Sequence, residues 1–82
     1  MVKAILDPKF KKKLLKIKDN SLKDRIIKQL EKLKLNPEFG KPMRFARKGT
    51  RELHVQPHRI AYIYLPEKEV IIFLDIYHKD IQ

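Results

Sequence analysis

Apolar and polar residues alternate most regularly in two short segments, residues 51–56 and 59–64, which lie on either side of a break at Pro57. Such alternation predicts two β-strands, because successive strand side chains point to opposite faces of a sheet. The first strand would carry Leu53 and Val55 on one face and polar side chains on the other. The second strand is apolar on both faces, which is typical of a strand inside a sheet.

Three further segments have strand character. Residues 70–77 contain the most apolar run of the chain, and we expect them to supply the central strand; residues 2–6 and 43–46 are shorter candidates. Proline, glycine and charged residues interrupt the pattern between the strands and predict turns or loops. These breaks fall at residues 37–42, 47–50, 56–58 and 66–68.

Two amphipathic helices are predicted between the first strand and residue 37. Asp7 and Pro8 provide a capping oxygen and a first-turn proline for one helix. Ser21 and Asp24 resemble a capping box for the other, and Asn36 precedes the proline that ends it. The apolar positions recur every three or four residues, at Phe10, Leu14 and Ile17 and then at Leu22, Ile26, Leu30 and Leu33.

The order of these elements predicts an α+β fold. An N-terminal strand is followed by a helical hairpin and then by a four-stranded antiparallel meander, with all strands in one twisted sheet and the hairpin on one of its faces. The chain has 82 residues, 43% of them hydrophobic, which is enough for one small core. We therefore assign residues 1–82 to a single domain.

Composition narrows the class of protein. The chain has no cysteine, so neither a disulfide framework nor a thiolate metal site is available. No apolar run approaches the roughly 18 residues needed to span a bilayer, and the N-terminus does not read as a signal peptide. We expect a cytoplasmic protein without a membrane partner.

The positive charge is concentrated in the first part of the chain. The formal net charge is +10; residues 1–50 hold 16 Lys and Arg against 5 Asp and Glu, whereas residues 51–82 hold 4 against 5. Such a surface favours a polyanionic partner, bound through phosphate contacts that weaken with salt. A solvated lysine-rich helical surface would have the same composition.

The three histidines are the main candidates for chemistry. His54 and His58 flank the proline between the alternating segments, and His78 follows the last apolar run, so all three would meet at one edge of the sheet if these strands pair. Imidazoles and guanidiniums suffice for RNA cleavage by the 2′-hydroxyl, which needs a proton acceptor, a proton donor and cations around the phosphate. That reaction excludes DNA as a substrate. It needs no cofactor, and no metal-ligand motif is present.

Each candidate also has a structural interpretation. The histidines could be ordinary surface or structural residues. Arg59 could form an ion pair with Glu52 or Asp75 instead of binding phosphate.

The order and spacing of these residues resemble the RelE/ParE superfamily of type II toxin–antitoxin systems. The resemblance rests on residues 59–64, the short turn and apolar strand after them, the terminal His78, and the two lysine-rich helices ahead. Residues 51–58 together with Tyr77 and His78 look closest to the YafQ-like branch, in which histidines act as general acid and base.

The resemblance implies a ribosome-dependent mRNA endonuclease, an mRNA interferase. His54 and His78 match the histidines of that branch, His58 falls where it has an acidic residue, and Arg59 falls where RelE proper has a phosphate-binding arginine. The implied catalytic residues are His54, His78, His58 and Arg59, and the implied RNA-binding residues are Arg51, Arg44, Arg47, Lys48, Lys12 and Lys28.

Two other functions fit the same superfamily. A ParE-like inhibitor of DNA gyrase would need no catalytic imidazole, and a non-catalytic module that binds RNA or docks an antitoxin would need only the basic helices. The expected partners are a cognate antitoxin protein and, for the nuclease, mRNA on the ribosome with contacts to ribosomal RNA.

Overall fold

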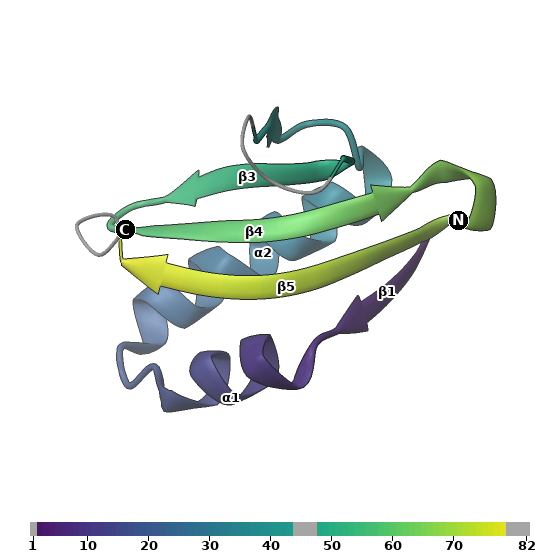
Figure 1. Cartoon of the computed structure of the whole chain (residues 1–82). Helices are drawn as coiled ribbons and strands as arrows, with labels where there is room; N and C mark the ends of the chain where they lie inside the picture. Colours follow the sequence, from purple (N-terminus) through teal and green to yellow (C-terminus); the bar gives the residue numbers. More distant parts are fainter. Residues whose placement is uncertain (1, 44–47, 79–82) are drawn as a thin grey trace.

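A computed structural model describes residues 2–43 and 48–78 of the chain (Figure 1). In chain order, its elements are β1 (Lys3–Leu6), α1 (Pro8–Lys16), α2 (Asn20–Leu35), β2 (Lys41–Pro42), β3 (Thr50–Val55), β4 (His58–Leu65), the 3-10 helix η1 (Pro66–Lys68) and β5 (Val70–His78). None of the helices in these two ranges is long and apolar enough to cross a membrane.

One mixed sheet of five strands carries the fold, in the order β1-β5-β4-β3-β2. Strands β2 to β5 pair antiparallel as a meander, which confirms the predicted α+β arrangement. Strand β1 runs parallel to β5 and forms an edge. Strand β5 is paired on both sides, but the middle position belongs to β4, so the prediction that residues 70–77 form the central strand is wrong in this respect.

Strand β2 is shorter and earlier than predicted. It comprises Lys41–Pro42, inside the segment expected to be a loop, and Lys41 pairs with Glu52 of β3. The expected strand at residues 43–46 is not seen at Met43, and its remaining residues lie outside the described part of the chain.

Aspartate caps begin both helices. Asp7 accepts a hydrogen bond from the Lys9 backbone N–H at 2.9 Å and Pro8 opens α1, as predicted. Helix α2 begins two residues earlier than expected, because Asp19 rather than Ser21 is its cap. The Asp19 carboxylate accepts from the backbone N–H groups of Ser21 and Leu22 at 2.9 and 3.2 Å.

The helical hairpin covers one face of the sheet, and no helix of the described residues lies on the other face (Figure 1). We call the second face the open face. The core between hairpin and sheet is made of Phe10, Leu22, Ile26, Leu30, Leu33, Leu53, Val55, Ile60, Tyr62, Ile71, Phe73 and Ile76. Because these side chains hold the strands rigidly from behind, polar groups on the open face have fixed positions.

A β-bulge interrupts the pairing of β4 with β5. Ala61 pairs with Asp75 and Tyr62 with Phe73, so Leu74 is an extra residue in β5. One extra residue reverses which face each later side chain occupies. Tyr77 therefore pairs with Arg59, whereas His78 pairs with His58.

Candidate functional site

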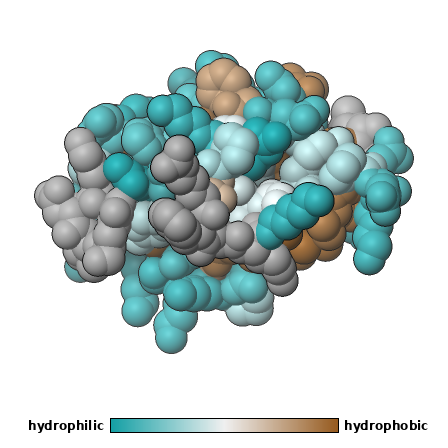
Figure 2. Space-filling model, turned by 45° about the horizontal axis from the view of Figure 1, so that its top comes forward, coloured by the Kyte–Doolittle hydropathy of each residue, from teal (hydrophilic) through white to brown (hydrophobic). Residues whose placement is uncertain are grey.

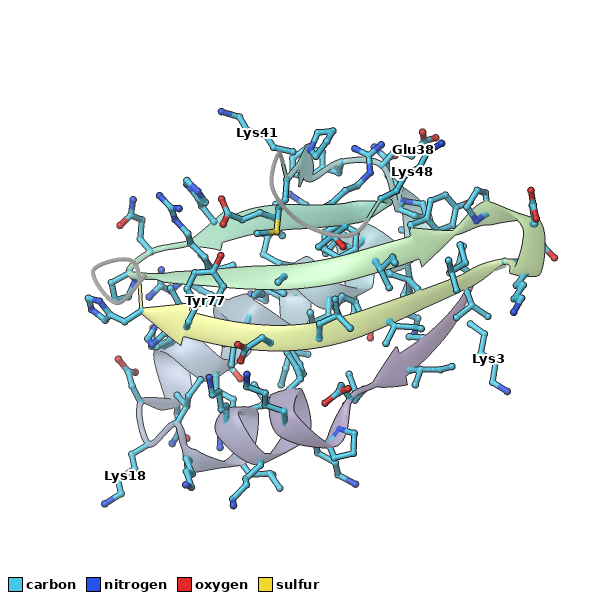
Figure 3. The ribbon with its side chains drawn as sticks, in the orientation of Figure 1. Lys3, Lys18, Glu38, Lys41, Lys48 and Tyr77 are labelled. Atoms are coloured by element: carbon cyan, nitrogen blue, oxygen red, sulfur yellow. The ribbon has the colours of Figure 1, made fainter. Side chains whose placement is uncertain are left out.

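Three strands place polar side chains in one row across the open face. The backbone of His54 on β3 pairs with Arg59 on β4, which pairs with Tyr77 on β5. Paired residues in adjacent strands point to the same face, and Glu52 shares that face because it lies two residues before His54. Figure 3 shows Tyr77 over the sheet on the side away from the helices. We call Glu52, His54, Arg59 and Tyr77 the open-face cluster.

Glu52 connects the other three members of the cluster. The Tyr77 hydroxyl donates to Glu52 Oε2 at 2.5 Å. The Nε2 atom of His54 lies 3.4 Å from Glu52 Oε1, and Arg59 Nη1 lies 3.5 Å from the same oxygen. The side chain of Glu52 is 16% exposed and that of Arg59 is 22% exposed, whereas His54 is 50% exposed. The imidazole is thus the member most open to a ligand.

The contacts within the cluster set the protonation of Glu52 and Tyr77. Burial acts to raise the pKa of Glu52, but the Tyr77 hydrogen bond, the charge of Arg59 and the contact with His54 together hold that pKa below its usual value. Burial and the neighbouring carboxylate raise the pKa of Tyr77 to about 12. At neutral pH, Glu52 is a carboxylate and Tyr77 a hydrogen-bond donor.

The other two histidines lie on the opposite face of the same end of the sheet. His58 pairs with Val55, a core residue, and with His78, and the two imidazole rings meet edge to face with centroids 5.5 Å apart. They line a pocket of about 270 Å³ together with Lys13, Lys16, Ile17, Ile76 and Tyr77. Burial and the charge of His78 lower the pKa of His58.

The structure therefore brings two histidines together and separates the third. All three histidines lie at one end of the sheet, as expected. His54 and His78 occupy opposite faces, however, so these two imidazoles do not converge on one phosphodiester as predicted. The bulge at Leu74 is the reason, since without it His78 would lie on the open face, which Tyr77 occupies instead. Arg59 does lie beside His54.

Arg51 has a structural position. Its guanidinium donates to the backbone oxygens of Glu38 and Gly40 at 3.0 and 2.7 Å and lies 3.7 Å from the Glu38 carboxylate. It pairs with Tyr62, on the core face, and so does not join the open-face cluster. The predicted phosphate contact at Arg51 is not supported.

The predicted RNA-binding residues are spread over the surface. Lys12 and Lys28 are exposed on α1 and α2, the elements behind the sheet. Lys48 lies near Glu38, at the end of the sheet away from Tyr77 (Figure 3). Arg44 and Arg47 lie outside the described residues. Seen from the β2 side, the surface is mostly hydrophilic with separate apolar patches (Figure 2).

Three residues of the site were missed from the sequence. Glu52 could have been found, because it lies two residues from His54 and so shares the polar face of a predicted strand. Tyr77 and Lys41 had none, since their position beside Glu52 depends on strand register. Among residues 2–43 and 48–78, no group of three or more His, Cys, Asp or Glu side chains could hold a metal ion.

Comparison with known structures gives the same fold. The isolated RelE toxin of E. coli superposes with a TM-score of 0.84 at 13% identity, over 100% of this chain and 88% of that one. Archaeal RelE in the RelE–RelB complex from Pyrococcus horikoshii OT3 gives 0.82 at 13% identity, over 99% and 98%. A conserved hypothetical protein from Helicobacter pylori gives 0.64 at 27% identity, over 95% and 94%.

Comparison by sequence identifies the family. A search of curated proteins found no match. The family model described as "ParE toxin of type II toxin-antitoxin system, parDE" matches residues 4–82, nearly the whole chain. The chain therefore belongs to the ParE toxin family of type II toxin–antitoxin systems, within the RelE/ParE superfamily.

Proposed function

We propose that this toxin is an mRNA endonuclease whose chemistry takes place at the open-face cluster. The observation that carries the proposal is the contact of one carboxylate, Glu52, with an imidazole, a guanidinium and a phenol on the open face of the sheet. These are the groups that cleavage by a 2′-hydroxyl requires.

Glu52 and His54 divide the two proton transfers. The ionised Glu52 carboxylate accepts the proton of the 2′-hydroxyl as the 2′-oxygen forms a bond to phosphorus. The His54 imidazolium donates a proton to the 5′-oxygen as its bond to phosphorus breaks. The products are a 2′,3′-cyclic phosphate and a 5′-hydroxyl, and no cofactor takes part. His54 is thus the one histidine that takes part, whereas histidines act as both general acid and general base in the YafQ-like branch.

Arg59 acts on the phosphate, and Tyr77 holds the Glu52 carboxylate in place. The guanidinium carries a fixed positive charge that stabilises the extra negative charge on the phosphoryl oxygens. The Tyr77 hydroxyl stays protonated at neutral pH, because its pKa is raised to about 12, and it donates its one hydrogen bond to Glu52. Lys41, paired with Glu52 across β2 and β3, adds a cation at the rim.

The surrounding charge supports an RNA partner on the ribosome. With a net charge of +10, the domain attracts phosphate backbones, and its exposed lysines on α1 and α2 are available for ribosomal RNA while the open face meets the mRNA. A cognate antitoxin is the second proposed partner, since relatives of the same fold are seen in toxin–antitoxin complexes.

Primer extension on a translated mRNA tests the proposal. We expect cuts that appear only with the toxin and the ribosome and leave 2′,3′-cyclic ends. The matched control is an mRNA with a single 2′-deoxynucleotide on the 5′ side of the cut, which should abolish that cut and no other. Cleavage that persists at the deoxy position would refute attack by the 2′-hydroxyl.

A ParE-like action on gyrase is the second candidate, favoured by the name of the matching family. That activity needs a protein-binding surface and no proton transfer. Inhibition of gyrase supercoiling by a variant lacking the His54 imidazole, with no cleavage by the wild type, would decide for it.

A further inference from the structure

We propose that Phe39 is a stacking platform for the base of the nucleotide next to the bond that is cut. The inference rests on the proposed nuclease function and adds a base-binding subsite to it.

An exposed aromatic side chain shares a pocket with the proposed catalytic groups. Phe39 is 57% exposed, and among the exposed large apolar side chains of residues 2–43 and 48–78 it is the one aromatic. It lines a pocket of about 260 Å³ with both residues assigned to proton transfer. The complete lining is Phe39, Gly40, Lys41, Glu52, Leu53 and His54. A nucleotide with its phosphate at Glu52 and His54 therefore has its base or a neighbouring base within reach of the Phe39 ring.

The loop that carries Phe39 is fixed from two sides. The buried Tyr62 hydroxyl donates to the Pro37 carbonyl at 2.8 Å and accepts from the Gly40 backbone N–H at 2.9 Å. Arg51 donates to the carbonyls of Glu38 and Gly40, the residues on either side of Phe39. These bonds explain why Arg51 is absent from the open-face cluster.

Gly40 is required for this close approach. A Cβ atom at that position would lie 2.6 Å from the Tyr62 hydroxyl and 2.9 Å from the Glu52 carbonyl oxygen, closer than any side chain tolerates. The loop thus lies directly against the β3 backbone at Glu52. An aromatic ring held on such a loop loses little conformational entropy when it binds a ligand, which is the condition for a preformed stacking surface.

The residues that line the pocket favour a nucleobase as the ligand. The Phe39 ring has no hydrogen-bonding group, so it offers its π-face to any of the four bases, while Lys41 beside it can meet the backbone phosphate. Such a subsite gives affinity and position with little sequence preference.

A fluorescent base at the cleavage site tests the proposal. The probe is a ribosome-bound mRNA with 2-aminopurine next to the cut and a 2′-deoxynucleotide that blocks cleavage. Phe39→Leu keeps an apolar side chain but removes the aromatic ring, and Phe39→Trp restores one. Leu35→Ala is the matched control, because Leu35 is an exposed apolar residue outside the pocket lining. Circular dichroism confirms that each variant is folded.

We expect the wild type and Phe39→Trp to quench 2-aminopurine, and Phe39→Leu to lose the quenching and bind about 5- to 100-fold more weakly. Leu35→Ala should behave as the wild type. Equal quenching by the wild type and Phe39→Leu would overturn the proposal. A Phe39→Leu variant that loses only antitoxin binding would overturn it too. Ring-dependent quenching by a wild type that cuts no RNA would uphold the subsite and refute the nuclease function.

Discussion

Glu52 is the residue on which the open-face cluster depends. Its carboxylate is mostly buried, yet it is ionised at neutral pH, because Tyr77, Arg59 and His54 all place a donor or a positive charge against it. A buried charge is tolerated only with such partners. Glu52 therefore has two effects: it stabilises the end of the sheet, and it aligns the guanidinium and the imidazole toward one ligand.

Replacing that charge tests both effects. Glu52→Gln should lower the free energy of unfolding at pH 7 by about 1–3 kcal/mol, the size of a hydrogen bond to a charged group. Because the pKa of Glu52 is lowered in the folded state, its contribution is present above the unfolded-state pKa and disappears as the pH falls through the folded-state pKa. Urea unfolding at pH 7 and pH 3 should show the gap between wild type and variant closing in acid. A gap of equal size at both pH values would contradict this account of Glu52.

The elements of the fold were predicted well, and their register was not. Both helices, the antiparallel meander and the Asp7 cap follow from apolar periodicity and from residue chemistry near each element. The extra residue at Leu74 leaves no such signal, because neither a glycine nor a proline marks it, and the bulge alone decides the face that His78 occupies. The prediction that His54 and His78 converge failed at the same point, because it depended on a one-residue count in β5.

The paired ends of β4 and β5 should respond to pH through His58. Its imidazole is partly buried against His78, with Lys13 and Lys16 lining the same pocket, and its pKa is lowered. Below the unfolded-state pKa, the unfolded chain gains a proton that the folded state resists, so stability falls in acid. Between pH 7 and pH 5, the wild type should therefore lose more stability in thermal unfolding than His58→Gln does. A variant that loses as much as the wild type would exclude His58 as a source of this acid sensitivity.

At the scale of the whole molecule, the helical hairpin and the sheet separate two kinds of surface. The charge of residues 1–50 lies largely on the helices behind the sheet, and the proposed acid–base groups, Glu52 and His54, lie on the open face. The sequence indicated both the basic helices and the polar strand residues, but it could not show that they lie on opposite sides of the sheet. That separation suits a toxin that holds a large polyanion with one side and acts on a single strand with the other.

The central claim is that the proposed cleavage takes place on the open face of the sheet, and a comparison of two histidine variants tests it directly. Cleavage of ribosome-bound mRNA in a single turnover is measured for His54→Gln and His78→Gln side by side, with folding checked by thermal unfolding. We predict that His54→Gln cuts about 10²- to 10⁴-fold more slowly and that His78→Gln stays within about threefold of the wild type. Loss of cleavage in His78→Gln, with His54→Gln still active, would place the reaction on the helical side of the sheet and contradict the account.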